Sequence, residues 1–362
     1  MTLTKQMIAL KVQQGRTLLT GLQTEYDMRL AAEKALAGKI QAQFTAAEKA
    51  TLKKFLALYG DPDVLQFQVR EILEPWYKLE PQYNDTILYE NTQALRNGRK
   101  STLNLINIQK NKNEQLRLFD FDRSIYNNLR NQTFTASAHT MERVRQDIMK
   151  NVAQSYSEGL GIKDAARNLN KKFTQLNGFE ANRIARTEIN SAQNVGNYQT
   201  LIDYDINYQQ WWTGQDARVR DSHRALHAMI TKVGNKFPNG LMHPGDRSGP
   251  IKEWIHCRCT IVPYLMPLGF MAPLGMVTFR ESDIIPIPGF EPEFGIVGRR
   301  LLRENPVKPI KPITSKPRKV IAEQKPKTIA DHAIVDKKKF RNYTDDGKHL
   351  LDDLSNTYPT PR

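Results

Sequence analysis

The sequence predicts an α+β protein: a mostly helical N-terminal region, a small mixed α/β domain with a short antiparallel sheet, and a disordered basic C-terminal tail. The first 61 residues contain no proline and are rich in Ala, Leu, Lys, Gln and Glu, which favours helix. Two β-prone segments, YQQWWT at 208–213 and TIVPY at 260–264, enclose a stretch rich in turn residues. Prolines recur after residue 284, where apolar periodicity is lost.

The N-terminal region is predicted to contain two successive helices within residues 1–60. Apolar residues recur at helical spacing between Leu30 and Phe44. Thr45 and Glu48 have the spacing of a capping box, which predicts that a second helix begins at residue 46 and runs to 59. Gly60, Asp61 and Pro62 are expected to end it. More helices with polar connections are expected over residues 63–135.

Helical periodicity is strongest between residues 141 and 202. Val144, Ile148 and Val152 predict an amphipathic helix over 141–160, and a shorter helix follows over 163–173. In the next predicted helix, 180–202, Glu188 lies within the apolar stripe. A carboxylate on a buried face needs a partner, so a structural ion pair is predicted, with Arg183 and Arg186 nearby but mostly to the sides.

The charge balance favours a polyanionic partner, nucleic acid before membrane. Lys and Arg outnumber Asp and Glu by 53 to 38, which gives a net charge of +15. No run of about eighteen apolar residues predicts a membrane span. Two cysteines separated by a single residue cannot form a disulfide framework, so a reducing cytoplasm is expected. In the tail, residues 299–327 contain ten basic and two acidic residues. The residues expected to contact DNA phosphates there are Arg299, Arg300, Lys308, Lys311, Arg318 and Lys319.

Residues 222–259 contain both cysteines and several histidines, and three interpretations stay open. Zinc could be held by His223, Cys257 and Cys259 with one more histidine. A metal-dependent nuclease would need carboxylates and imidazoles; the candidates are Asp216, Asp221, His223, Asp246 and His256. In the third interpretation, the turn sequences and arginines hold long loops on a small sheet, without catalysis.

Four segments, taken in order, resemble the Mu F-like phage minor head proteins, also called phage head morphogenesis proteins. They are RIARTEINSAQN at 183–194, WWTGQDARVRDSHRALHA at 211–228, HPGD at 243–246 and IHCRCTIVPY at 255–264. The residues that carry the motifs are Arg186, Thr187, Glu188, Trp212, Asp216, Arg218, Pro244, Asp246 and Arg258. The resemblance covers about residues 140–264. The predicted organisation is a helical N-terminal region for portal and assembly contacts (1–135), a Mu F-like minor head domain (136–284) and, outside the resemblance, the Pro-rich basic disordered tail (285–362).

The resemblance implies a non-catalytic virion component incorporated at the portal vertex during procapsid assembly. Implied partners are the portal protein, the scaffold or major capsid protein, and double-stranded DNA bound without sequence preference during packaging or ejection; no membrane is implied. The expected location is the capsid interior near the portal, and the host cytoplasm during assembly. The alternatives are a metal-dependent nuclease or toxin-like enzyme, and a DNA-binding protein of the host.

The resemblance also bears on the metal. Family members often carry a Cys-x-x-Cys paired with a later His-x-x-Cys-x-Cys, a pattern that suggests zinc. At the positions of the family's first two cysteines this chain has Arg220 and His223, and at the position of the family's histidine it has Trp254. No cofactor is therefore expected beyond a possible structural zinc on His223, Cys257 and Cys259, with His227, His243 or His256 available as a fourth ligand.

Overall fold

The computed structural model describes residues 2–59, 65–110, 116–118, 123–214 and 216–289. Met1–Pro288 form one compact unit, which contains the helices and strands described below. Of the proline-rich tail, residues 285–289 are described; 285–286 form a short strand, so the expected start of disorder at residue 285 is wrong. The six candidate DNA-contacting residues lie outside the described residues. The observed class is the α+β class that the sequence predicts: long helices and a small antiparallel sheet.

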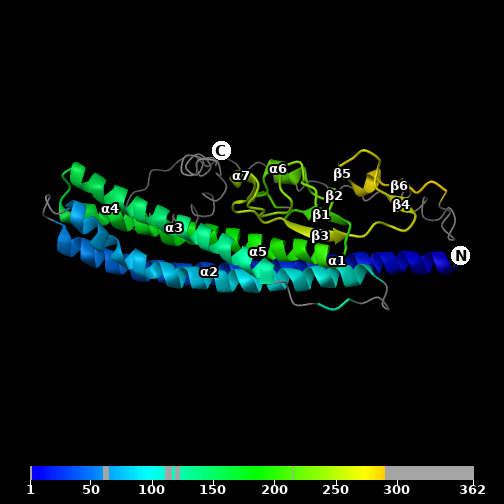
Figure 1. Cartoon of the computed structure of the whole chain (residues 1–362), viewed down its shortest axis with the longest axis horizontal. Coiled ribbons are helices and arrows are strands. Elements are labelled where there is room, and N and C mark those ends of the chain that lie inside the picture. The colour runs from blue at the N-terminus through cyan, green and yellow to red at the C-terminus, as the bar shows by residue number, and fades with distance from the viewer. Residues whose placement is uncertain (1, 60–64, 111–115, 119–122, 215, 290–362) are drawn as a thin grey trace, which may run out of the picture. The chain divides into compact units, whose positions relative to one another are not determined.

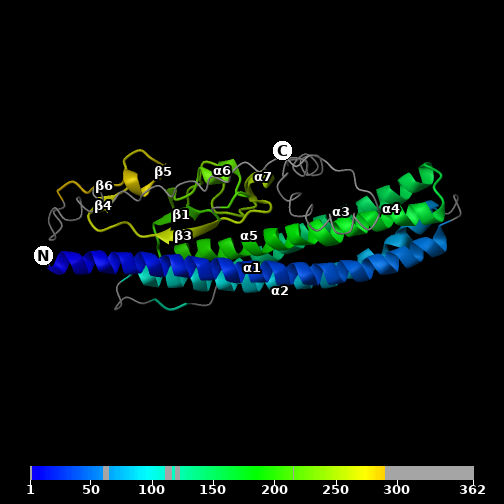
Figure 2. The ribbon, with the colours of Figure 1, turned by 180° about the vertical axis from the view of Figure 1, so that it is seen from behind.

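Five helices form the larger part of this unit (Figures 1 and 2). They are α1 (Thr2–Leu58), α2 (Leu65–Gln109), α3 (Arg123–Ser157), α4 (Ile162–Gln175) and α5 (Ala181–Asp203), with a π-helical turn, Leu176–Glu180, before α5. The predicted amphipathic stripe of α3 is confirmed, because Val144, Ile148 and Val152 are buried. Residue 135, the expected domain boundary, lies inside α3.

The predicted second helix at residue 46 is wrong, because α1 is continuous through Thr45 and Glu48. Ile40, Phe44 and Phe55 are fully buried, so one apolar stripe runs through the expected break. The Glu48 carboxylate accepts a hydrogen bond from Asn177, 129 residues away, and does not cap a helix. Tertiary packing thus overrides a local capping signal.

The helices α2 and α5 approach each other backbone to backbone at two glycines. A Cβ atom added at Gly98 would lie 2.2 Å from the Gln193 carbonyl oxygen, and one added at Gly196 would lie 2.2 Å from that of Leu95. Any side chain at either position would force the helices apart. This crossing fixes α5, the helix that supports the sheet.

The main sheet has four antiparallel strands in the order β3-β1-β2-β5. They are β1 (Tyr208–Trp212), β2 (Ile230–Lys232), β3 (Thr260–Tyr264) and β5 (Thr278–Phe279). Both predicted strands are therefore present. Two short strands, β4 (Phe270–Met271) and β6 (Ile285–Pro286), pair separately, and two single-turn helices, α6 (Asp221–Arg224) and α7 (Ile251–Trp254), lie in the loops.

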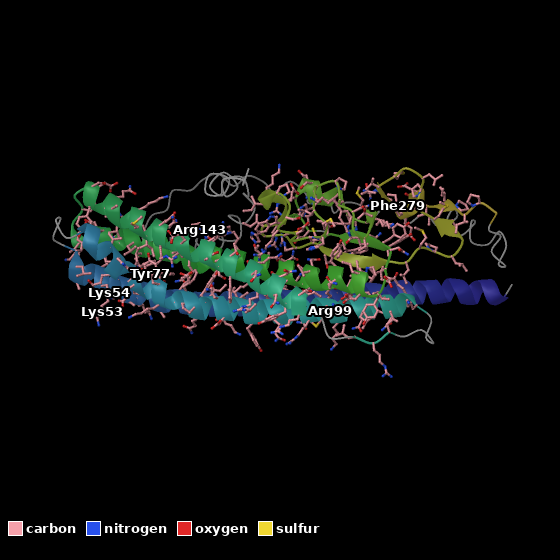
Figure 3. All side chains as sticks on the ribbon, in the orientation of Figure 1. Lys53, Lys54, Tyr77, Arg99, Arg143 and Phe279 are labelled. Carbon is pink, nitrogen blue, oxygen red and sulfur yellow. The ribbon has the colours of Figure 1, made fainter. Side chains whose placement is uncertain are left out.

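Side chains of the helices cover the edge strand β3, and Figure 3 shows side chains filling the space between helices and sheet. The Ile261 amide donates to the Asn194 side chain of α5 (3.1 Å), and the Gln109 amide of α2 donates to the Pro263 carbonyl (3.2 Å). An edge strand protected in this way cannot pair with another chain. None of the described helices is long and apolar enough to cross a membrane.

Candidate metal centre

The structure brings His223, Cys257 and Cys259 together as a buried cluster, here called the metal centre. Their candidate ligand atoms all lie within 4.8 Å of one another. The His223 Nδ1 atom is 3.5 Å from the Cys257 sulfur and 3.4 Å from the Cys259 sulfur. Each residue exposes 2% or less of its surface. Two sulfurs and one imidazole nitrogen are the donors that zinc prefers, so the residues present fit this metal.

Two loops and the start of a strand position the three side chains. Cys257 and Cys259 precede β3 and, two residues apart on an extended chain, point to the same side. His223 lies in α6, and its Nε2 atom is 3.0 Å from the Glu253 carboxylate of α7. Such a carboxylate orients a ligating imidazole, and in a metal-bound state, in which Nδ1 carries no proton, it accepts a hydrogen bond from the protonated outer nitrogen.

The two thiols titrate as a coupled pair. Burial alone would raise the pKa of the Cys257 thiol, but hydrogen bonds from Cys259 and His223 outweigh it and leave that pKa well below its ordinary value. The hydrogen bond to Cys257, together with burial, raises the pKa of Cys259 well above its ordinary value. The site therefore stabilises one thiolate by itself, and a bound cation would stabilise the second.

The other three nearby histidines lie outside this group and have their own partners. His227 Nδ1 accepts from the Thr213 amide (3.3 Å), and His243 Nδ1 is 3.0 Å from the Pro244 carbonyl. His256 Nε2 contacts the Arg186 guanidinium. Burial and the neighbouring Arg186 and Arg258 lower the pKa of His256 to about 3, so its ring is neutral. The described residues thus supply three ligands at this place.

Glu188 forms the predicted structural ion pair, but with a partner that the sequence did not indicate. Its carboxylate is 2.7 Å from the Arg247 guanidinium and accepts a second bond from the Asn91 amide (2.8 Å). Arg186 pairs with Glu33 at 3.0 Å instead. Thr187 accepts from the His256 amide through its hydroxyl (3.0 Å). The Arg-Thr-Glu motif therefore ties α5 to four other segments.

The HPGD turn is bound to the surface of α5. The Asp246 carboxylate accepts from the amides of Met242 and Ser248, both at 2.9 Å, which closes the turn. Gly245 has φ +79°, and its carbonyl accepts from the Ser191 hydroxyl at 2.7 Å. A Cβ atom at Gly245 would lie 2.7 Å from the Ser191 Cα atom, so this position needs glycine.

The remaining motif residues lie at the end of β1 and before β3. The Asp216 carboxylate is 3.2 Å from the Arg258 guanidinium and 3.9 Å from that of Arg218. Half-buried Trp212 is the last residue of β1. The carboxylates of Asp216 and Asp246 have structural partners, that of Asp221 is fully exposed, and His223 is in the metal centre. Among the described residues, these candidate nuclease groups do not form one site.

Two buried charged residues of α1 belong to this region, although sequence reasoning missed them. Arg29 donates to the main-chain carbonyl of Arg258 (2.8 Å) and to the Asn190 side chain (3.0 Å). The Glu25 carboxylate accepts from Ser101, Gln193 and Thr260 at 2.9, 2.8 and 3.2 Å. Glu25, Arg29 and Glu33 recur every four residues, a row that could have marked one buried polar face of the helix.

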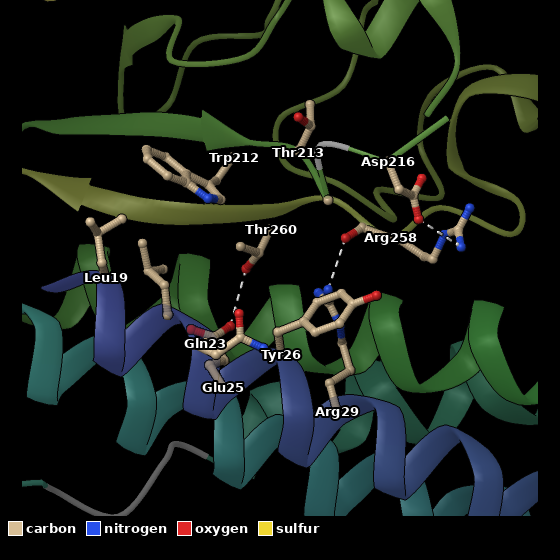
Figure 4. Close-up of a pocket in the computed structure, with 12 residues that line it drawn as sticks. Leu19, Gln23, Glu25, Tyr26, Arg29, Trp212, Thr213, Asp216, Arg258 and Thr260 are labelled. Carbon is tan, nitrogen blue, oxygen red and sulfur yellow. Dashed lines mark hydrogen bonds and ion pairs between the residues drawn. The ribbon is translucent and has the colours of Figure 1, made fainter. Parts of the chain in front are cut away.

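A cleft of about 340 Å³ lies between α1 and the ends of β1 and β3 (Figure 4). Its walls include Tyr26 and Trp212, and its polar lining includes Arg29, Arg258, Glu25 and Asp216. The two cations and two anions balance. The cleft has the volume of a small-ligand site but no surplus charge that would select an ion.

Comparison with known proteins identifies the family of the segment that contains these motifs. Residues 146–262 match the family described as phage Mu protein F like protein. An uncharacterized protein of Methanocaldococcus jannaschii is 28% identical over 148 residues, which cover 38% of this chain and 22% of the relative. No solved structure matches the chain significantly. The matched segment, residues 146–262, includes the metal centre and the HPGD turn and is similar to the phage Mu protein F like family.

Proposed function

We propose that this chain is a phage head morphogenesis protein: a minor, non-catalytic component of the virion that is incorporated at the portal vertex during procapsid assembly. The observation that carries the proposal is the family match over residues 146–262. The internal bonds of the matched segment support a structural role. Glu188, Asp246 and Asp216 are each held by arginines or backbone amides, and none is left to act on a substrate.

The proposed partners are the portal protein, the scaffold or major capsid protein, and packaged double-stranded DNA. The long helices α1–α3 offer extended surfaces for protein contacts. The basic residues 299–327, with a surplus of eight positive charges, suit sequence-independent contacts with phosphates. The proposed location is the capsid interior near the portal, after assembly in the host cytoplasm.

The test is the protein content of purified particles. Procapsids and mature virions are separated on gradients, and the chain is quantified by mass spectrometry relative to portal and coat proteins. We expect a few copies per portal ring in both particles, and particles isolated with a tagged portal protein should retain the chain. Absence from both particles would refute the proposal and would favour a free DNA-binding protein of the host.

Catalysis is tested separately. Purified protein is incubated with supercoiled plasmid and Mg²⁺, Mn²⁺ or Zn²⁺, and we expect no nicking above a buffer control. Cleavage that His223→Ala or Asp216→Ala abolishes would overturn the non-catalytic assignment.

We further propose that the metal centre binds one structural zinc through His223, Cys257 and Cys259. Zinc would be held by two thiolates and the Nδ1 atom, with Glu253 orienting the imidazole. Reduced protein should contain about one zinc per chain by elemental analysis, and Cys259→Ser or His223→Gln should lose it. His227→Gln is the matched control, because its imidazole contacts Thr213 and lies outside the cluster. Equal zinc content in all four proteins would exclude this ligand set.

A further inference from the structure

Four arginines from three segments lie around His256, and a fifth, Arg218, shares Asp216 with one of them, Arg258. All five lie outside the metal centre and the tail. This arginine cluster consists of Arg183 and Arg186 on α5, Arg218 and Arg220 before α6, and Arg258 before β3. Arg186 contacts the His256 ring, and Arg220 donates to the carbonyl of Ile255, the residue before it. Arg258 follows His256 by two residues. Burial lowers the pKa of the Arg258 guanidinium, and the nearby positive charges of Arg186 and Arg218 lower it further.

The cluster carries more positive charge than its protein neighbours neutralise. Arg186 pairs with Glu33, and Arg183 shares Glu180 with Arg143. In the part of the chain that the structure describes, Asp216 is the one carboxylate in contact with Arg218, Arg220 and Arg258. These last three guanidinium groups therefore face one carboxylate, a surplus of two charges. Grouped cations that exceed their counter-charges are costly to maintain, which suggests that an external anion completes them.

Several guanidinium N–H groups remain for a ligand. A guanidinium has five N–H donors. Within the described ranges, Arg220 donates to one acceptor, the Ile255 carbonyl, and Arg258 contacts one carboxylate, that of Asp216. The Arg218 side chain is 50% exposed, with its Nε atom 3.9 Å from Asp216. The cluster thus combines partly buried, fixed arginines with one that reaches solvent.

The backbone at His256 holds the cluster in place. His256 has φ +56°, a left-handed conformation that non-glycine residues rarely adopt. Its amide donates to Thr187 at 3.0 Å, while its ring faces Arg186. Backbone conformations of this kind are concentrated at functional sites, where the surrounding contacts maintain them.

We propose that the arginine cluster binds phosphate groups of a nucleic-acid backbone. Planar guanidinium forks bind phosphate oxygens in pairs, and every cation of the cluster is arginine. A phosphate approached from three segments can accept from several forks at once, and adjacent backbone phosphates together match a surplus of two charges. A single carboxylate would neutralise one charge only. This inference rests on the DNA partner of the proposed function and names the site that would bind it. The two can fail separately, because a chain absent from virions would still bind DNA here.

Full-length protein and a fluorescent 20-base-pair duplex provide the test. Dissociation constants are measured by anisotropy over a series of salt concentrations for the wild type, Arg218→Gln and Arg220→Gln. Each substitution should weaken binding about three- to tenfold and lower the slope of log affinity against log salt by about 1. The control is Arg167→Gln, which removes a 68%-exposed arginine of α4, paired with Asp164, and should leave the slope unchanged.

Further measurements separate phosphate binding from other causes. Inorganic phosphate should compete with the duplex more strongly than chloride at equal ionic strength, and this difference should shrink in Arg220→Gln. Thermal melts check folding; if Arg220→Gln is destabilised by losing its bond to Ile255, half-exposed Arg218 carries the test. Slopes and affinities equal to those of Arg167→Gln would overturn the proposal. So would variants that lose binding to a poly-glutamate peptide and keep their affinity for DNA.

Discussion

The buried carboxyl group of Glu48 predicts that the protein is less stable at alkaline pH than a glutamine variant. Glu48 is 7% exposed on α1, and burial raises its pKa from 4.5 to about 7, although the Asn177 hydrogen bond opposes the shift. Its second oxygen, Oε1, is buried and has no hydrogen-bond partner among the residues that the structure describes. The ionised form is therefore disfavoured in the folded protein relative to the unfolded chain.

The size of the effect follows from the pKa difference. Because the folded-state pKa is the higher one, the stabilising contribution is complete below pH 4.5 and is lost as pH rises through 7. A difference of about 2.5 pKa units at 1.36 kcal/mol per unit corresponds to about 3 kcal/mol. Glu48→Gln keeps an oxygen for Asn177 and cannot ionise, so it should gain up to about 3 kcal/mol over the wild type by pH 8.5.

Urea unfolding of both proteins at several pH values between 4 and 8.5 measures this difference. Other groups titrate in the same range; burial, for instance, lowers the pKa values of His227 and His243, which acts in the opposite direction. Subtracting the wild-type curve from the variant curve removes these shared contributions. A difference that stays constant from pH 4 to 8.5 would refute the argument that Glu48 is held protonated by burial.

Three more predictions rest on single contacts. Gly196→Ala places a Cβ atom 2.2 Å from a carbonyl oxygen of α2 and should destabilise the protein by about 1–3 kcal/mol or more. Gly38→Ala, whose added Cβ atom has nothing within 4 Å, should stabilise the protein by about 0.5–1 kcal/mol. Thermal melts that rank the two variants in the opposite order would contradict the close helix crossing. Arg247→Met leaves the Glu188 carboxylate buried without its cation and should cost about 3–5 kcal/mol; adding Glu188→Gln should recover much of it in the same denaturation assay, and additive losses would speak against the pair. Because burial and nearby arginines lower the folded-state pKa of His256 from 6.5 to about 3, wild-type stability should fall as pH drops below 6.5; His256→Gln should lose part of this acid sensitivity, and identical stability–pH curves would argue against a neutral buried ring.

Side-chain patterns with a local cause were predictable. Apolar residues at a spacing of four identified α3, because a helix that packs on one side repeats its buried face with that period. β-branched and aromatic residues identified β1 and β3. The side chains of Cys257 and Cys259 share one direction simply because they are two residues apart on an extended chain. The same local logic failed at Thr45, where a capping signal lies inside a helix that packing keeps continuous.

The sequence by itself determined the fold class and the two central strands, since each depends on neighbouring residues and their spacing. It also named His223, Cys257 and Cys259 as candidate zinc ligands, but the tertiary structure brought His223 to the two cysteines, 34 residues away from Cys257. Only the tertiary structure decided which charges are paired. Glu188 pairs with Arg247 and not with the arginines of its own helix, and Arg29 of α1 binds the carbonyl of Arg258, 229 residues away. The physical reason is that a buried charge must find a partner wherever the folded chain passes, and chain crossings leave no periodic trace in the sequence.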